Sequence, residues 1–190
     1  HHRDAYPQGD ARMAPHPSHL VGRQLGSDFK LKDGFRMYHG RVIPGFPSHP
    51  HRGFETLTLA RSGFIDHSDS LGACARFGHG DAQWMTAGRG VMHSEMFPLV
   101  NEDRDNPAEL FQIWINLPAE DKMVPAHFKM LWSEDIPVHR FTDAEGSTTT
   151  VTTIAGALGD RAPCAPPPHS WASRPEAGLA VWTIRLDRGA

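Results

Sequence analysis

The stretch Leu110-Phe111-Gln112-Ile113-Trp114-Ile115-Asn116-Leu117 decides the fold class, because its side chains alternate with a period of two. On an extended strand its odd-numbered residues, one phenylalanine, two isoleucines and a leucine, share one apolar face. Its even-numbered residues, a leucine, a glutamine, a tryptophan and an asparagine, share the other face. This pattern is typical of a β-strand with one strongly apolar side.

Short runs of similar β-forming character follow one another at intervals of about ten residues, each bounded by Gly, Pro, Asp or Asn. They cover residues 35–43, 54–61, 63–67, 73–77, 83–86, 91–97, 110–117, 148–154 and 179–186. The best helical candidate, residues 118–131, is interrupted by Pro125. Many short strands with turns between them predict an all-β protein, and we favour a double-stranded β-helix, or jelly-roll barrel, which can bury ligands at its mouth.

Composition divides the chain into three parts. Residues 1–27 mix Pro, His, Gly and charged residues without periodicity, which predicts a loop-like N-terminal arm. Residues 28–160 contain most of the strand runs and are the expected barrel. Residues 161–190 begin with a Pro-rich connector that reads as extended polyproline-like chain and end with one more strand, too short to form a domain.

Charge and cysteine content exclude several classes of function. The 190 residues carry a formal net charge of -3 and no long Lys/Arg block, so we expect no direct nucleic-acid binding. Cys74 and Cys164 form no C-x-x-C motif or disulfide framework, which favours a reducing compartment. No stretch approaches the ~20 apolar residues of a membrane span, so we expect a cytoplasmic protein without membrane contact.

Two short pairs carry the chemistry: His49-Pro50-His51 and His93-Ser94-Glu95. The members of each pair are two positions apart, so on a strand both point to the same side of the sheet. Two such strands facing each other inside a barrel would bring three imidazoles and one carboxylate to a single point. These four residues are the predicted metal ligands.

The competing interpretation is chance, since the chain has 13 histidines and exposed histidines are common. The neighbours of the two pairs argue against it. A β-forming run from Phe54 to Leu59 follows the first pair, and Val91, Met92, Met96 and Phe97 surround the second. Buried imidazoles need polar or metal partners, which favours the metal site.

A second carboxylate competes for a place in the predicted site. Along one continuous strand Glu55 would face the same side as His49 and His51, so either Glu55 or Glu95 fits the position of the fourth ligand. Three neutral imidazoles and one carboxylate suit iron, manganese, cobalt, nickel, copper or zinc, and ligand chemistry alone does not separate these ions.

Two further motifs are interpreted as turn structure and not as binding sites. His67-Ser68-Asp69 is another pair two positions apart, beside Ser70 and Gly72, and is interpreted as a solvated hairpin end. Its alternative role is to orient a ligand imidazole. Gly88-Arg89-Gly90 lacks the lysine and helix of a phosphate-binding loop and is interpreted as a tight turn leading into the second ligand strand.

The spacing H-x-H-x3-E of residues 49–55 is similar to the first motif of the cupin superfamily. Residues 47–56 and 80–96, read as Pro-Ser-His-Pro-His-Arg-Gly-Phe-Glu-Thr and Gly-Asp-Ala-Gln-Trp-Met-Thr-Ala-Gly-Arg-Gly-Val-Met-His-Ser-Glu-Met, closely resemble the pirin family. The stretch 110–117, followed by Asp121-Lys122-Met123, resembles the next strand and turn of that family. The resemblance covers most of residues 45–131.

Resemblance to pirins implies two stacked cupin domains, with one iron ion held in the N-terminal barrel by residues matching His49, His51, His93 and Glu95. Glu55 then matches a residue that does not bind the metal and supports the site from behind. The chain departs from this pattern in length, because a second barrel would need on the order of 100 more residues. Residues 161–190 would be the remnant of that barrel or a substitute for it.

The resemblance also implies function. The first hypothesis is a dioxygenase that opens flavonols of the quercetin type, with Glu95 as the catalytic carboxylate that takes the substrate's hydroxyl proton. Its expected apolar walls are Phe46, Trp84, Met85 and Met96, which fit a core role equally well. The second hypothesis is a non-enzymatic, iron-dependent redox sensor that modulates a partner protein. The third is a closed structural zinc site.

Overall fold

The computed structural model describes residues 1–188, and within them the chain forms twelve strands, short 3-10 helices and no α-helix. The strands are β1 (His2–Tyr6), β2 (Gly45–His51), β3 (Phe54–Ser62), β4 (Phe64–Asp69), β5 (Cys74–Gly78), β6 (Ala82–Thr86), β7 (Val91–Met96), β8 (Asn106–Asn116), β9 (His127–Leu131), β10 (Val138–Thr142), β11 (Thr148–Ala155) and β12 (Val181–Leu186). The 3-10 helices are η1 (Pro17–Leu20), η2 (Ala119–Asp121), η3 (Trp171–Ser173) and η4 (Pro175–Ala177). The predicted all-β class is therefore confirmed.

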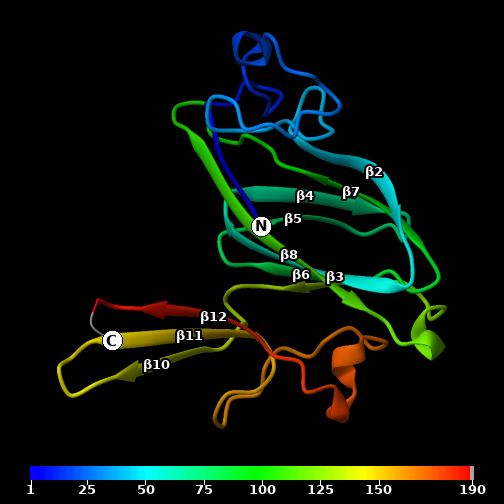
Figure 1. Ribbon diagram of the computed structural model, residues 1–190, viewed down its shortest axis with the longest axis vertical. Coiled ribbons are helices and arrows are strands. Elements are labelled where there is room, and N and C mark those ends of the chain that lie inside the picture. Colours follow the sequence, from blue (N-terminus) through cyan, green and yellow to red (C-terminus); the bar gives the residue numbers. More distant parts are fainter. Residues whose placement is uncertain (189–190) are drawn as a thin grey trace.

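The first nine strands form the two walls of a barrel (Figure 1). A five-stranded sheet has the order β1-β8-β3-β6-β9, and a four-stranded sheet has the order β2-β7-β4-β5. Every pairing within these sheets is antiparallel. The alternation along residues 110–117 matches this arrangement, because one face of β8 lines the barrel and the other is covered from outside.

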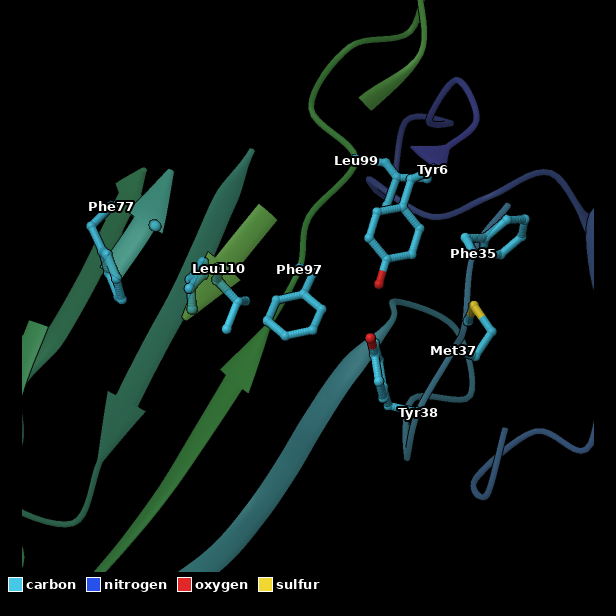
Figure 2. Close-up of a cluster of buried hydrophobic side chains, with 10 residues drawn as sticks. Tyr6, Phe35, Met37, Tyr38, Phe77, Phe97, Leu99 and Leu110 are labelled. Carbon is cyan, nitrogen blue, oxygen red and sulfur yellow. The ribbon is translucent and has the colours of Figure 1, made fainter. Parts of the chain in front are cut away.

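The apolar core at one end of the barrel joins both sheets to the loop-rich N-terminal segment (Figure 2). Phe77, Phe97 and Leu110 come from the barrel, while Tyr6, Phe35, Met37 and Tyr38 come from the segment before β2. All of these side chains are buried. The N-terminal segment is thus an integral part of the barrel's core, and burial of its aromatic rings stabilises that end.

A three-stranded sheet, β10-β11-β12, lies below the barrel in Figure 1. Leu57, Leu59 and Ile115 of the five-stranded sheet pack against Ile154 and Ala155 of β11 in a second apolar cluster. The odd-numbered, strongly apolar face of residues 110–117 is therefore the outer face of the barrel. The three-stranded sheet covers Ile115 and part of Phe111 on this face, while Ile113 stays 37% exposed.

Two of the expected boundaries differ from the structure. The arm expected over residues 1–27 contains β1, which pairs with β8 and extends the five-stranded sheet. The barrel expected over residues 28–160 ends at β9, because β10 and β11 belong to the three-stranded sheet. The single strand expected after residue 160 is β12, and it completes that sheet by pairing with β11.

Eight of the nine expected strand runs overlap observed strands, and residues 35–43 do not. Tyr38 adopts a φ of 56° within that run, a left-handed conformation that an extended strand does not contain. Its apolar residues are buried as part of a loop. Four observed strands lie outside the nine runs. Strand β2 was expected only through the pair His49 and His51, and β1, β9 and β10 were not expected, since their sequences are short and rich in His, Arg and Lys.

Within residues 1–188, no helix has the length and apolar character needed to cross a membrane.

Candidate metal centre

Strands β2 and β7 bring the two predicted pairs together. They run antiparallel as neighbours in the four-stranded sheet, and His49 lies directly opposite His93. His51 lies two residues further along β2, on the same face as His49. The local sequence therefore places three imidazoles on one side of the sheet, facing the barrel interior.

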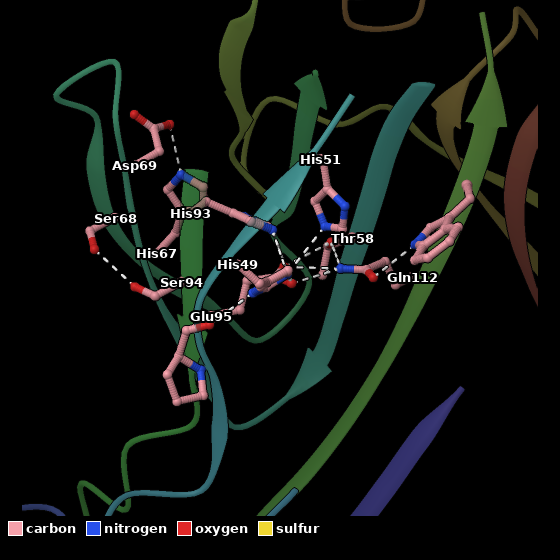
Figure 3. A network of polar contacts seen from close by, with 12 residues as sticks. His49, His51, Thr58, His67, Ser68, Asp69, His93, Ser94, Glu95 and Gln112 are labelled. Carbon is pink, nitrogen blue, oxygen red and sulfur yellow. Dashed lines mark hydrogen bonds and ion pairs between the residues drawn. The ribbon is translucent and has the colours of Figure 1, made fainter. Parts of the chain in front are cut away.

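The three imidazoles converge on one point through their Nε2 atoms (Figure 3). His49 Nε2 lies 3.2 Å from His51 Nε2 and 3.0 Å from His93 Nε2. Two nitrogens bonded at about 2.1 Å to one ion, at about a right angle, lie about 3.0 Å apart. The three ring nitrogens thus fit a shared divalent ion.

A backbone contact fixes which nitrogen of His49 faces the other rings. His49 Nδ1 lies 2.9 Å from the carbonyl oxygen of Pro47. Because a carbonyl oxygen only accepts hydrogen bonds, Nδ1 carries the proton and donates it. Nε2 is then left with a free lone pair, which is the form that binds a metal ion.

Burial keeps two of the imidazoles neutral. His93 is 1% exposed, and desolvation, with smaller contributions from His49, His51 and His67, lowers the pKa of His93 to about 3. Desolvation and the neighbouring His49 lower the pKa of His51 to about 4. At neutral pH both rings are available as metal ligands without first losing a proton.

The fourth predicted ligand, Glu95, lies beside the histidine triad and is held by the opposite sheet. The nearest distance between its carboxylate and His93 Nε2 is 3.9 Å. Gln112 Nε2 donates to both carboxylate oxygens, at 3.0 and 2.9 Å, and Thr58 Oγ1 donates to one of them at 3.4 Å. Burial raises the pKa of Glu95, although these donors oppose the shift. The group of side chains that meets the distances for one ion is His49, His51 and His93.

A cavity of about 200 Å³ opens beside the triad. It is lined by His2, Phe46, His49, His51, Ile65, Glu95, Phe97, Leu110, Gln112 and Trp114. Phe46, one of the expected apolar wall residues, lines this cavity. The even-numbered face of β8, with Gln112 and Trp114, forms the cavity wall opposite the histidines. The alternation in the sequence identified this face but did not assign it to the site.

Three residues expected near the metal lie on other surfaces. Glu55 points away from the triad and accepts hydrogen bonds from Thr86 and Ser170. Trp84 is fully buried in the cluster between the barrel and the three-stranded sheet. Met96, on β7, lies opposite Gly45 of β2. It lines a hollow on the outer face of the four-stranded sheet, together with Ile43.

Strand parity explains these three positions. Trp84 and Met85 are consecutive, so only one of them can face the barrel interior, and Met85 packs with Val91 of the ligand strand. Met96 follows Glu95 directly and therefore points to the other side of β7. Glu55 lies beyond a break at Arg52–Gly53, after which the chain enters the other sheet, and the parity counted from His49 no longer holds.

The pair His67 and Asp69 is buried, which corrects the interpretation of a solvated hairpin end. Both side chains are fully inaccessible, and His67 Nε2 lies 2.9 Å from Asp69 Oδ2. The ring of His67 stacks on Phe128 and lies 5.3 Å from the ring of His93. The pair thus packs directly behind a metal-facing imidazole.

The segment Gly88-Arg89-Gly90 is a tight turn between β6 and β7, as predicted. Gly90 N donates to the carbonyl oxygen of Ala87 at 2.9 Å. A Cβ atom on Gly88 would lie 2.2 Å from the carbonyl oxygen of Val124, so a larger residue does not fit. The turn connects β6 of the five-stranded sheet to β7, the strand that carries His93.

Fold and site together define a barrel of the cupin class with a three-histidine centre. A family model described as Pirin matches residues 11–115, more than half of the chain. The chain belongs to the pirin family.

Individual relatives agree with this assignment. Pirin of Homo sapiens is 48% identical over 122 residues, covering 62% of this chain and 40% of its own length. Pirin-1 of Arabidopsis thaliana is 43% identical over 140 residues, covering 72% of this chain and 45% of its own length. A crystal structure of quercetin 2,3-dioxygenase from Acinetobacter baumannii is similar with a TM-score of 0.58 and 40% identity, over 65% of this chain and 42% of that chain. The chain thus spans less than half the length of these relatives.

Proposed function

We propose that the chain binds one divalent metal ion, Fe(II), through His49, His51, His93 and Glu95, and acts as a dioxygenase on flavonols of the quercetin type. The observation that carries this proposal is the convergence of three imidazole Nε2 atoms beside a buried carboxylate at the wall of a cavity. The donor set of three imidazoles and one carboxylate suits iron and its neighbours in the first transition series. When bound, the ion would supply Lewis-acid and redox chemistry toward a hydroxyl group and dioxygen.

Glu95 is the side chain suited to move a proton. Burial raises its pKa above that of a free carboxyl group, which makes the ionised form a stronger base. A flavonol hydroxyl next to a carbonyl group would enter from the cavity and give its proton to a Glu95 oxygen. The resulting anion would face the three-histidine centre.

Cavity size limits how such a substrate binds. A volume of about 200 Å³ is below the ~300–1,000 Å³ of typical small-molecule sites. A flavonol would enter with its reacting end, and its remaining rings would extend past Trp114, which lines the cavity and is 64% exposed. Phe46 and the Trp114 ring would hold the aromatic substrate by stacking.

Oxygen consumption by protein purified without a metal-affinity tag and loaded anaerobically with Fe(II) tests the proposal. We expect quercetin to start oxygen uptake, and Glu95→Gln to retain part of the iron but lose this uptake. Glu55→Gln is the matched control, because Glu55 faces away from the triad. Uptake by Glu95→Gln at the wild-type rate rejects the proton-accepting role, and absence of uptake in the iron-loaded wild type rejects the enzyme.

The position of β2 favours a second function, an iron-dependent redox sensor that modulates a partner protein. β2 is the edge strand of its sheet and carries His49 and His51, which are partly exposed, next to exposed Pro47 and Ser48. If the charge of the bound ion changed, the change in electrostatic potential would act on the exposed surface at β2, because no other strand lies between the ion and that surface.

An anaerobic titration separates this function from the enzyme. The two oxidation states of the iron-loaded protein are compared for binding to a candidate partner protein. The sensor requires the two affinities to differ, while equal affinities reject it. Iron binding without quercetin-dependent oxygen uptake favours the sensor over the enzyme.

A further inference from the structure

The side chain of Gln112 contacts the buried carboxylate of Glu95 (Figure 3). The same side chain also contacts the exposed indole of Trp114. Its Nε2 donates to both oxygens of Glu95, and its Oε1 accepts a hydrogen bond of 3.0 Å from Trp114 Nε1. One amide therefore connects the mouth of the cavity with the carboxylate beside the metal centre.

The partners of this amide fix its orientation. The indole N–H only donates and an ionised carboxylate only accepts. A flipped amide would place its oxygen against Glu95 and its NH2 group against the Trp114 N–H, so both contacts would become repulsive. Trp114 thus holds the NH2 group of Gln112 toward Glu95.

The two ends of the contact come from opposite walls of the barrel. Glu95 lies on β7 of the four-stranded sheet, while Gln112 and Trp114 lie two positions apart on β8 of the five-stranded sheet. Thr58, directly opposite Gln112 on β3, adds a third contact from that wall. The place of the carboxylate relative to the imidazoles is therefore set across the barrel and not only by its own strand.

We propose that Gln112 is the positioning residue that presents the Glu95 carboxylate to the metal ion, and that Trp114 keeps Gln112 in the orientation this requires. The inference rests on the proposed metal site. It also gives Trp114 two kinds of contact: its exposed ring, which packs against Phe54 and His51, borders the cavity where an aromatic ligand would enter, and its N–H is committed to Gln112. Gln112 therefore links the two: a ligand that moves Trp114 at the cavity mouth would also change the position of Glu95 at the metal centre.

A double-mutant cycle with Co(II) as the probe tests the contact between Gln112 and Glu95. Co(II) affinity is measured by competition with a chromophoric chelator, and the visible spectrum of the bound ion reports its coordination. We expect Gln112→Met to weaken Co(II) binding about 10- to 100-fold and to change the spectrum, as loss of a ligand's hydrogen-bond partner generally does. In the Glu95→Gln background the same substitution should cause no further loss, because the carboxylate it positions is gone.

Trp114→Phe tests the second contact, since it keeps an aromatic ring and removes the N–H donor. The side chain is mostly exposed, so this variant remains informative even if Gln112→Met fails to fold. We expect it to weaken Co(II) binding and to shift the spectrum in the direction of Gln112→Met. Trp132→Phe, at a partly exposed tryptophan outside the cavity lining, is the matched control and should match the wild type.

The outcomes separate the two proposals. A wild-type protein that binds no Co(II) overturns the proposed metal site and this inference with it. If the wild type binds Co(II) and Gln112→Met lowers Co(II) affinity equally in the wild-type and Glu95→Gln backgrounds, the inference alone is overturned. Trp114→Phe indistinguishable from Trp132→Phe overturns the orienting role of Trp114.

Discussion

Ser170 Oγ donates a hydrogen bond of 2.9 Å to the carboxylate of Glu55, which lies 115 positions earlier in the chain. The same carboxylate oxygen accepts a bond of 3.1 Å from the backbone N–H of Trp171, and the other oxygen accepts one of 2.7 Å from Thr86 Oγ1. Burial raises the pKa of Glu55 in spite of these donors. Glu55 thus ties the segment before β12 to the outer face of the barrel.

Removal of the hydrogen bond between Ser170 and Glu55 is expected to destabilise the fold. Ser170→Ala leaves a buried carboxylate oxygen with one donor fewer, so we expect a loss of about 1 to 3 kcal/mol in the free energy of unfolding. Urea denaturation of the metal-free protein measures the loss. Ser133→Ala, at an exposed serine, is the control and should be close to neutral. Equal stabilities for the two variants would contradict the role of the contact.

The two glutamates are expected to separate stability from metal binding. Glu55→Gln should lower the free energy of unfolding and leave metal affinity unchanged, because Glu55 faces away from the triad. Glu95→Gln should lower metal affinity by about tenfold or more. Isothermal titration with Co(II), together with thermal unfolding of both variants, measures the two quantities. A comparable loss of metal affinity in both would show that the assignment of Glu95 as the ligand is wrong.

The fold class was predictable from sequence because alternation along residues 110–117 and closely spaced turns are local signals. The three-stranded sheet was harder to separate from the barrel, since its strands carry the same local pattern as barrel strands. Residues 35–43 have strand-like composition, yet the left-handed Tyr38 turns them into a loop whose aromatic rings complete the core. Such a conformation depends on tertiary packing and leaves no periodic signal.

The histidine triad was predictable because each pair lies within one strand, where parity holds. Parity failed for Glu55, since Gly53, with a φ of 74°, interrupts the chain between the two sheets. For Trp84 and Met96, composition alone does not say which face of a strand points into the barrel. Gln112 is adjacent to Glu95 only across the barrel, a relationship that one sequence without strand pairing does not contain.

Acid is expected to destabilise the metal-free protein through the imidazoles of His93, which is buried, and His51, which is half-buried. Their pKa values are about 3 for His93 and about 4 for His51, against 6.5 in an unfolded chain, because burial disfavours the charged forms. Groups with lowered pKa values contribute stability that is present above pH 6.5 and is lost as the pH falls toward those lower values. The raised pKa of Glu95 acts in the opposite direction, but Glu95 is retained in both proteins compared below.

Urea unfolding in the presence of a chelator, over a pH series from about 7 to about 4.5, measures this effect. His93→Leu removes one of the two groups, so its free energy of unfolding should fall less steeply with decreasing pH than that of the wild type. His19→Gln, at an exposed histidine far from the centre, should retain the wild-type slope. A slope for His93→Leu equal to that of the wild type would show that His93 is not the source of the acid sensitivity.

Close approach of β2 to β7 at Gly45 is expected to be necessary for the metal centre. Gly45 has a φ of 133°, and a Cβ atom there would lie 2.5 Å from the carbonyl oxygen of Glu95. Gly72 also has a positive φ, 86°, but its Cβ would meet nothing within 4 Å, which makes it the matched control. Gly72→Ala should cost about 1 to 3 kcal/mol in the free energy of unfolding through backbone strain alone. Gly45→Ala should cost about 1 to 3 kcal/mol more, because β2 must also move away from β7.

This movement should also weaken metal binding, because His49 and His51 lie on β2 while His93 lies on β7. Co(II) titration of the two folded variants measures the effect below their unfolding temperatures. We expect Gly45→Ala to lose affinity and Gly72→Ala to retain it, although both carry backbone strain. If the two variants bind Co(II) equally well, the spacing between β2 and β7 at Gly45 does not control the distances among the three imidazoles.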